Sequence, residues 1–108
     1  MSVLVDFSIF PVGKAEHLSP YVASVVRLIA DSGFDYQLTA MGTLFETDDV
    51  SEALALIEQA HGVLDAAGCE RVYATVKLDI RAGAIGRLAR KTASVEARLD
   101  ECEAAHDQ

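Results

Sequence analysis

The sequence predicts a protein of the α+β class, in which two helices cover one face of an antiparallel four-stranded sheet. Segments with strand and helix periodicity follow one another in the order strand, helix, strand, strand, helix, strand. The 108 residues suit a single domain over 1–108, and 51% of them are hydrophobic, which is enough for a core. This order is that of the ferredoxin-like βαββαβ sandwich, and right-handed crossovers place its first and third strands in the middle.

The first strand is expected over residues 3–10, where hydrophobic residues occupy every second position. Asp6 and Ser8 point to the opposite side, so the strand is half-buried. Pro11 and Gly13 end it. The inward-facing set is Val3, Val5, Phe7 and Ile9.

The first helix is expected to begin with Ser19 as its N-cap and Pro20 at its first helical position. Gly33 is the expected C-terminal cap, since glycine adopts a left-handed conformation at low cost. An apolar stripe at helical spacing consists of Val22, Val25, Val26, Ile29 and Ala30.

Two strands over about 34–39 and 43–47 are expected to form a hairpin with its turn at Met41 and Gly42. Glu46 lies in the middle of the second of these strands, which is otherwise apolar and hydroxyl-bearing. A charge there is costly unless it has a partner or a use. We therefore expect Glu46 to lie in or beside a ligand pocket.

The second helix and the fourth strand follow. Asp48 or Asp49 is the expected N-cap; Glu52, three residues after Asp49, has the spacing of a capping box, and Gly68 ends the helix. Its expected buried residues are Val50, Ala53, Leu54, Ile57, Ala60 and Leu64. The strand over 71–80 alternates, with Val72, Ala74, Val76, Leu78 and Ile80 on the side of the helices.

A third helix is expected over about 85–103. Its apolar positions step by three and four residues and form a narrow, heptad-like seam: Ile85, Leu88, Thr92, Val95, Leu99 and Cys102. Such a seam can pack on its own domain or on another subunit.

Composition limits the classes of partner. The net charge of −8 disfavours a nucleic acid, and no apolar run is long enough to span a membrane. Cys69 and Cys102 lack a CxxC spacing, which favours a reduced, cytoplasmic setting with both thiols as small core residues.

No catalytic motif stands out in the sequence, and neither a metal nor a cofactor is expected, because the three histidines lack metal-ligand spacing. Asp6 and Glu46 fall on one sheet face, where three interpretations remain open. They can be paired with Lys77, a hydroxyl or water; they can act as acid and base; or they can hold a small cationic or amino-bearing ligand. In the last case Tyr36, Phe45 or Tyr73 would supply a stacking surface. Lys77 can form a surface ion pair within its strand, or it can meet an anionic group or a carboxylate of a partner subunit.

Several runs of residues together resemble the small thiamine-binding protein family. They are Phe-Pro-Val-Gly (10–13), Leu-Ser-Pro-Tyr-Val-Ala (18–23), Ser-Gly-Phe-Asp-Tyr-Gln-Leu-Thr-Ala-Met-Gly-Thr-Leu-Phe-Glu (32–46), His61 and Arg-Val-Tyr-Ala-Thr-Val-Lys-Leu-Asp-Ile-Arg (71–81). The similarity extends from Val3 to about Leu99. Its most specific parts are the Met-Gly-Thr-x-x-Glu run and the Lys-x-Asp-x-Arg strand.

The resemblance implies a ferredoxin-like protein that assembles into homo-oligomers, commonly dimers paired into tetramers. It implies binding of thiamine or its hydroxymethylpyrimidine portion without a reaction, with Glu46 as acceptor for the aminopyrimidine or counter-charge for the thiazolium. By position, Ser8, Met41, Gly42 and Thr43 match the same family motif. The full set of expected ligand-binding residues is Asp6, Ser8, Tyr36, Met41, Gly42, Thr43, Glu46, Tyr73 and Lys77.

Two alternatives to a binding protein remain. One is a small dimeric enzyme of the ferredoxin-like type that acts on a polar aromatic molecule through Asp6, Glu46 and Tyr73. The other is an oligomeric regulatory or interaction protein without a dedicated ligand, in which the polar sheet face serves assembly alone.

Overall fold

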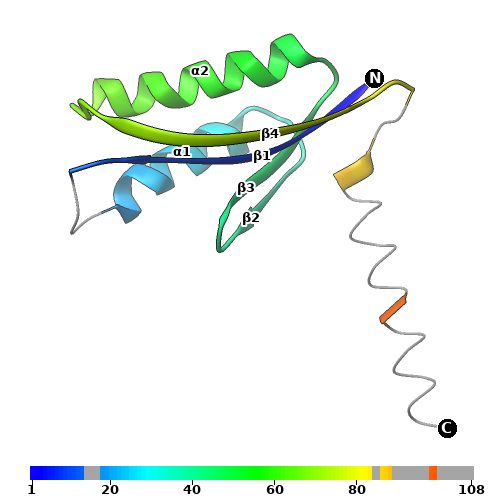
Figure 1. Ribbon diagram of the computed structural model, residues 1–108, viewed down its shortest axis with the longest axis horizontal. Coiled ribbons are helices and arrows are strands. Elements are labelled where there is room, and N and C mark those ends of the chain that lie inside the picture. The colour runs from blue at the N-terminus through cyan, green and yellow to red at the C-terminus, as the bar shows by residue number, and fades with distance from the viewer. Residues whose placement is uncertain (14–17, 84–85, 89–97, 100–108) are drawn as a thin grey trace, which may run out of the picture.

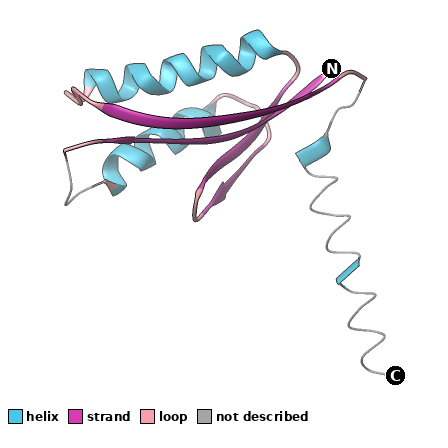
Figure 2. Cartoon of the chain, in the orientation of Figure 1, coloured by secondary structure: helices cyan, strands magenta, loops and turns pink. Residues whose placement is uncertain are grey.

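The computed structural model describes residues 1–13, 18–83, 86–88 and 98–99. The elements are β1 (Ser2–Pro11), α1 (Ser19–Asp31), β2 (Tyr36–Thr39), β3 (Gly42–Thr47), α2 (Val50–Ala66) and β4 (Val72–Arg81) (Figure 2). Most of the predicted third helix over 85–103 lies outside the described residues, of which 87–88 and 98–99 are helical. No helix in the described ranges is long and apolar enough to cross a bilayer.

The four strands form one antiparallel sheet in the order β2-β3-β1-β4 (Figure 1). The prediction that the first and third strands occupy the middle is therefore confirmed. Val5 of β1 lies opposite Phe45 of β3 on one side and opposite Leu78 of β4 on the other. This register places the alternate residues of all three strands on the same face, so that one face is largely hydrophobic and meets the helices while the other mixes polar and apolar residues.

The core lies between one sheet face and the two helices. β1 supplies the predicted row of Val3, Val5, Phe7 and Ile9, each at most 8% exposed. Phe7 and Phe45 meet edge to face, with ring centroids 6.3 Å apart. The helices add Val25 and Ile29 from α1 and Ala53, Leu56, Ala60 and Leu64 from α2, joined by Cys69.

Both helices differ from the prediction by small shifts. Ser19 is not the N-cap of α1: Leu18 holds that position, and its carbonyl accepts the Val22 N–H at 3.0 Å. In α2 the predicted inward residue Leu54 is exposed and Leu56 is buried instead. The face of α2 that packs on the sheet is therefore rotated toward Leu56, away from the position that the hydrophobic pattern predicted. Of the two expected caps, Asp48 and Asp49, the structure has Asp49, whose carboxylate accepts the Glu52 N–H at 2.8 Å.

The hairpin turn lies one residue earlier than predicted, at Ala40 and Met41, and Gly42 is the first residue of β3. Glycine is needed at 42 because the backbone of β1 passes very close. A Cβ atom added there would lie 2.8 Å from the carbonyl oxygen of Phe7. The tip of the hairpin therefore packs directly on the middle of β1.

The hydrophobic row of β4 is where the predicted core fails. Val76, Leu78 and Ile80 point to the helix side, because they lie opposite Phe7, Val5 and Val3. They are nevertheless 39%, 38% and 51% exposed. β4 is the edge strand beyond β1, and the two helices do not cover this part of it.

Candidate functional site

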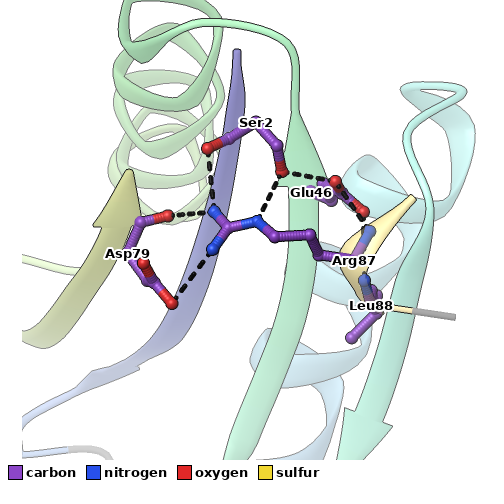
Figure 3. Close-up of polar contacts among 5 residues, drawn as sticks. All are labelled: Ser2, Glu46, Asp79, Arg87 and Leu88. Carbon is purple, nitrogen blue, oxygen red and sulfur yellow. Dashed lines mark hydrogen bonds and ion pairs between the residues drawn. The ribbon is translucent and has the colours of Figure 1, made fainter. Parts of the chain in front are cut away.

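Glu46 is buried on the sheet face opposite the helices, and the chain itself satisfies its carboxylate (Figure 3). The Ser2 hydroxyl donates to Oε2 at 2.5 Å. The backbone N–H groups of Arg87 and Leu88 donate to Oε2 at 3.1 Å and to Oε1 at 3.2 Å. Because residues 87–88 are helical, the carboxylate accepts from consecutive N–H groups as a capping side chain does.

The side chain of Arg87 ties the same residues to β4. Its Nε donates to the Ser2 hydroxyl at 3.0 Å, and its Nη2 donates to the Ser2 carbonyl at 2.8 Å and to the Asp79 carbonyl at 2.5 Å. Its Nη1 lies 3.1 Å from the Asp79 carboxylate. We call Ser2, Glu46, Asp79, Arg87 and Leu88 the Glu46 network; it joins β1, β3 and β4 to the segment that follows the sheet.

The network keeps Glu46 ionised. Burial by itself raises the pKa of this carboxyl group. The hydrogen bonds from Ser2, Leu88 and Arg87, together with the positive charge of Arg87, outweigh that effect and hold the pKa below its ordinary value of 4.5. The side chain is thus a permanent anion at neutral pH, and its charge is matched inside the protein.

Arg87 is the residue that sequence reasoning missed. The signal was indirect, since a carboxylate within a strand requires a partner. The partner lies 41 residues further along the chain, so no local spacing connects the two. Arg87 also lies between the apolar positions of the predicted seam, and the helical pattern predicts that a charged residue there faces solvent.

A cavity of about 320 Å³ lies beside the network on the same sheet face. Asp6, Gln37 and Lys77 supply polar groups, and Leu88, whose N–H is held by Glu46, lines it as well. We call it the sheet-face cavity. Its complete lining is Leu4, Val5, Asp6, Gln37, Leu44, Lys77, Leu78, Asp79 and Leu88.

A smaller cavity of about 220 Å³, the hairpin cavity, lies where the hairpin tip meets β1 and α1. Four predicted ligand residues line it: Ser8, Met41, Gly42 and Thr43. Asp6, which lines the sheet-face cavity, has its Oδ1 3.5 Å from the position of a Cβ on Gly42. The two cavities share no lining residue, and α1 lines only the hairpin cavity, so that cavity lies on the helix side of the sheet.

The two predicted aromatic residues lie elsewhere. Tyr36 lines a groove of about 550 Å³ between α1 and β2, together with Arg27 and Leu38; we call this the helix groove. Tyr73 is near the start of β4 and packs on Phe10, with ring centroids 5.6 Å apart. Eight of the nine predicted residues are thus spread over three hollows and one aromatic pair, and the ninth, Glu46, lies in its own network, so the set is not gathered in one site. Within the described ranges, no three acidic, histidine or cysteine residues form a group that could hold a metal ion.

Comparison with known proteins gives a family. The model of a family described as thiamine-binding protein matches residues 5–96. A UPF0045 protein of Mycobacterium bovis is 38% identical over 99 residues, which span 92% of this chain and 96% of that protein.

Solved structures agree on the fold. The crystal structure of a hypothetical protein from Methanocaldococcus jannaschii superimposes with a TM-score of 0.75 at 29% identity, covering 88% of this chain and 96% of that one. A candidate thiamine biosynthesis or salvage protein of Thermotoga maritima gives a TM-score of 0.75 at 17% identity, covering 87% of this chain and 99% of that one. The latter likeness concerns the fold alone.

Proposed function

Because the chain belongs to the thiamine-binding protein family, we propose that it binds thiamine, or the hydroxymethylpyrimidine part of thiamine, without catalysing a reaction. The proposal includes self-association into a homo-oligomer and the cytoplasmic setting that the cysteine pattern favours. The observation that carries the proposed site is the sheet-face cavity, with Asp6 on its wall.

Size and charge favour this cavity over the other two hollows. Small-molecule sites commonly measure about 300–1,000 Å³. At about 320 Å³ the sheet-face cavity reaches that range, whereas the hairpin cavity, at about 220 Å³, does not. The helix groove is larger, but its charged residue is Arg27, which repels a thiazolium ion, whereas the sheet-face cavity has two carboxylates, Asp6 and Asp79, beside Lys77.

The lining of the sheet-face cavity suits a cationic, amino-bearing heterocycle. The Asp6 carboxylate accepts from an exocyclic amine or balances a positive ring, and the Gln37 amide offers both a donor and an acceptor to a pyrimidine edge. Leu4, Leu44 and Leu88 provide apolar walls for the ring faces. The net charge of −8 attracts a cation to the protein as a whole.

Glu46 enters the proposal through Leu88. Its carboxylate already accepts hydrogen bonds from Ser2, Arg87 and Leu88, so a direct bond to the ligand competes with these three donors. We therefore assign the direct contact with the ligand to Asp6. Glu46 acts through its hydrogen bond to the Leu88 N–H, which positions Leu88 in the cavity wall. Ser8, Met41, Gly42 and Thr43 line the hairpin cavity, which is the second candidate position for the ligand.

Calorimetric titration with thiamine and with hydroxymethylpyrimidine tests the proposal. We expect Asp6→Asn to weaken binding by about 10–100-fold, the loss of one charge-assisted hydrogen bond. Asp65→Asn, which removes the same charge from an exposed position on α2, is the matched control and should bind normally. Mass spectrometry of the thiamine recovered after incubation checks that no product forms.

Three results would contradict the proposal. Absence of heat with both compounds at millimolar concentration removes the function. A new product in the recovered thiamine would show that the protein catalyses a reaction, which contradicts the second part of the proposal. Normal affinity in a folded Asp6→Asn protein, together with a loss in Thr43→Val, moves the site to the hairpin cavity.

A further inference from the structure

The helix groove, between α1 and β2, has no role in the proposed function and presents apolar side chains to solvent. Val22 of α1 and Tyr36 and Leu38 of β2 line it, and each of them is more than a third exposed. The groove shares no lining residue with the sheet-face cavity. Whatever binds in the groove is therefore a different molecule from the ligand proposed above.

The two ends of the helix groove differ in charge. Leu18 and Leu38 line both this groove and the hairpin cavity, whereas Arg27 and Tyr36 line the groove alone. Arg27 and Tyr36 therefore mark the end away from the hairpin tip. Among the described residues Arg27 takes part in no ion pair, although Asp31 follows it by about one helical turn. This end of the groove is thus a cationic site whose charge the protein does not balance.

The backbone of β2 faces out of the sheet along the same groove. Among the described strands its one neighbour is β3. The Glu46 N–H donates to the Asp35 carbonyl at 3.0 Å, and residues that bond to a neighbouring antiparallel strand alternate with residues that do not. The N–H and C=O groups of Tyr36 and Leu38 therefore point away from β3. Their side chains lie on the helix side of the sheet, because Tyr36 is opposite the buried Phe45.

We propose that the helix groove binds the C-terminal end of a partner polypeptide, which adds a strand antiparallel to β2 and places its terminal carboxylate at Arg27. In this register the last residue of the partner lies opposite Tyr36, and the third residue from its end lies opposite Leu38. The side chains of these two partner residues point to the helix side, onto Val22 and Val26. The residue between them points to the other face. The partner is thus a tail in which apolar and polar residues alternate.

The two polar features of the groove select this occupant over others. An internal segment of a protein brings no carboxylate to Arg27, whereas a chain terminus forms a charge-assisted hydrogen bond with the guanidinium group. A fatty acid brings the carboxylate but offers no hydrogen bonds to the outward backbone groups of Tyr36 and Leu38. The net charge of −8 repels a tail that carries further acidic residues. The expected partner therefore ends in a short tail whose terminal carboxylate is its single negative charge.

Calorimetric titration with synthetic peptides tests the terminal carboxylate and the strand register separately. The probe is the hexapeptide acetyl-Thr-Val-Ser-Val-Ser-Val with a free C-terminus. Its C-terminal amide should bind at least about tenfold more weakly, because it lacks the charge at Arg27. N-methylation of the third residue from the end removes the N–H that bonds to the Leu38 carbonyl and should also weaken binding about tenfold. N-methylation of the second residue from the end, whose N–H points outward, is the matched control and should leave the affinity unchanged.

Protein variants place the peptide in the groove. Arg27→Gln should weaken binding of the free acid by about tenfold and leave binding of the amide unchanged, since only the acid uses this charge. Arg71→Gln removes an exposed arginine next to β4, at the opposite edge of the sheet, and should bind both peptides normally. Val22→Asp places a carboxylate in the groove and should abolish binding. Leu54→Asp, the same change at an exposed position of α2, is its control. Melting curves establish that each variant is folded.

Several results would overturn the inference. They are no heat with the free acid at roughly 1 mM peptide, equal affinities of the acid and the amide, equal losses from the two N-methyl positions, and normal binding by folded Arg27→Gln. Decanoate tests the fatty acid as occupant. We expect it to bind at least tenfold more weakly than the peptide. Affinity for decanoate as high as that for the peptide would assign the groove to fatty acids instead.

Discussion

β1 and β4 run side by side with the same alternation of hydrophobic and polar residues, yet they end in different environments. The hydrophobic row of β1 is at most 8% exposed, whereas Val76, Leu78 and Ile80 of β4 are 38–51% exposed. The difference arises from position, because β1 lies in the middle of the sheet and β4 at its edge. Alternation thus predicts a strand and the side to which each residue points, but not whether that side is covered.

The largest expected effect is the difference in stability loss between truncating a buried side chain in the middle of the sheet, Phe45 of β3, and truncating an exposed one at the edge, Leu78 of β4. Phe45→Ala removes a fully buried ring that packs on Phe7, and we expect it to lower the free energy of unfolding by about 3–5 kcal/mol. Leu78→Ala removes a partly exposed side chain and should cost about 1 kcal/mol in the monomer. Urea denaturation at low protein concentration measures both. A similar loss in the two variants would show that β4 is covered in solution.

The Glu46 network offers a second comparison, between a buried carboxylate on β3 and an exposed one at β4. Glu46→Gln leaves one amide oxygen for three donors and adds an N–H group, so we expect a loss of about 1–3 kcal/mol in unfolding free energy. Asp79→Asn affects a pair whose carboxylate is 58% exposed and should cost less than about 1 kcal/mol. Guanidinium denaturation at pH 7 ranks the two. A larger loss of unfolding free energy in Asp79→Asn than in Glu46→Gln would show that the network stabilises the fold mainly through its contact with β4.

The smallest effect is the pH dependence of the same contact. The folded pKa of Glu46 is below 4.5, so its stabilising contribution is present above that pH and is lost as the pH falls through the lower, folded value. The difference in unfolding free energy between wild type and Glu46→Gln should therefore shrink between pH 6 and pH 3. Denaturation curves of both proteins across this range test it. A constant difference would mean that Glu46 does not titrate with folding.

The sequence was sufficient for those features that depend on local spacing. The order of elements, the middle position of the first and third strands, the Asp49 cap and the burial of Cys69 are all confirmed. The errors are shifts of one or two residues, at Ser19, at the Met41 turn and at Leu54. At each of these points two neighbouring residues satisfy the same local rule, and only packing against the rest of the chain decides between them.

The site was harder to predict because it depends on distance along the strands. Period two places Asp6, Ser8, Glu46, Tyr73 and Lys77 on one face of the sheet, and the register agrees. A face extends over the length of the strands, however, so shared direction does not gather residues into one pocket. The partner of Glu46 comes from beyond β4, where the pattern of apolar residues gave no reason to single out Arg87.

Gly42, whose place is fixed by the carbonyl oxygen of Phe7, has a consequence for how relatives should be read. Its neighbour Met41 is 88% exposed and is free to drift in evolution without disturbing the backbone. A glycine at the equivalent position of another protein would indicate the same close approach of the hairpin to a neighbouring strand. It would not indicate that the two proteins bind the same ligand. Under the proposed function, relatives that share the binding specificity are recognised by Asp6, Gln37 and the leucines around them.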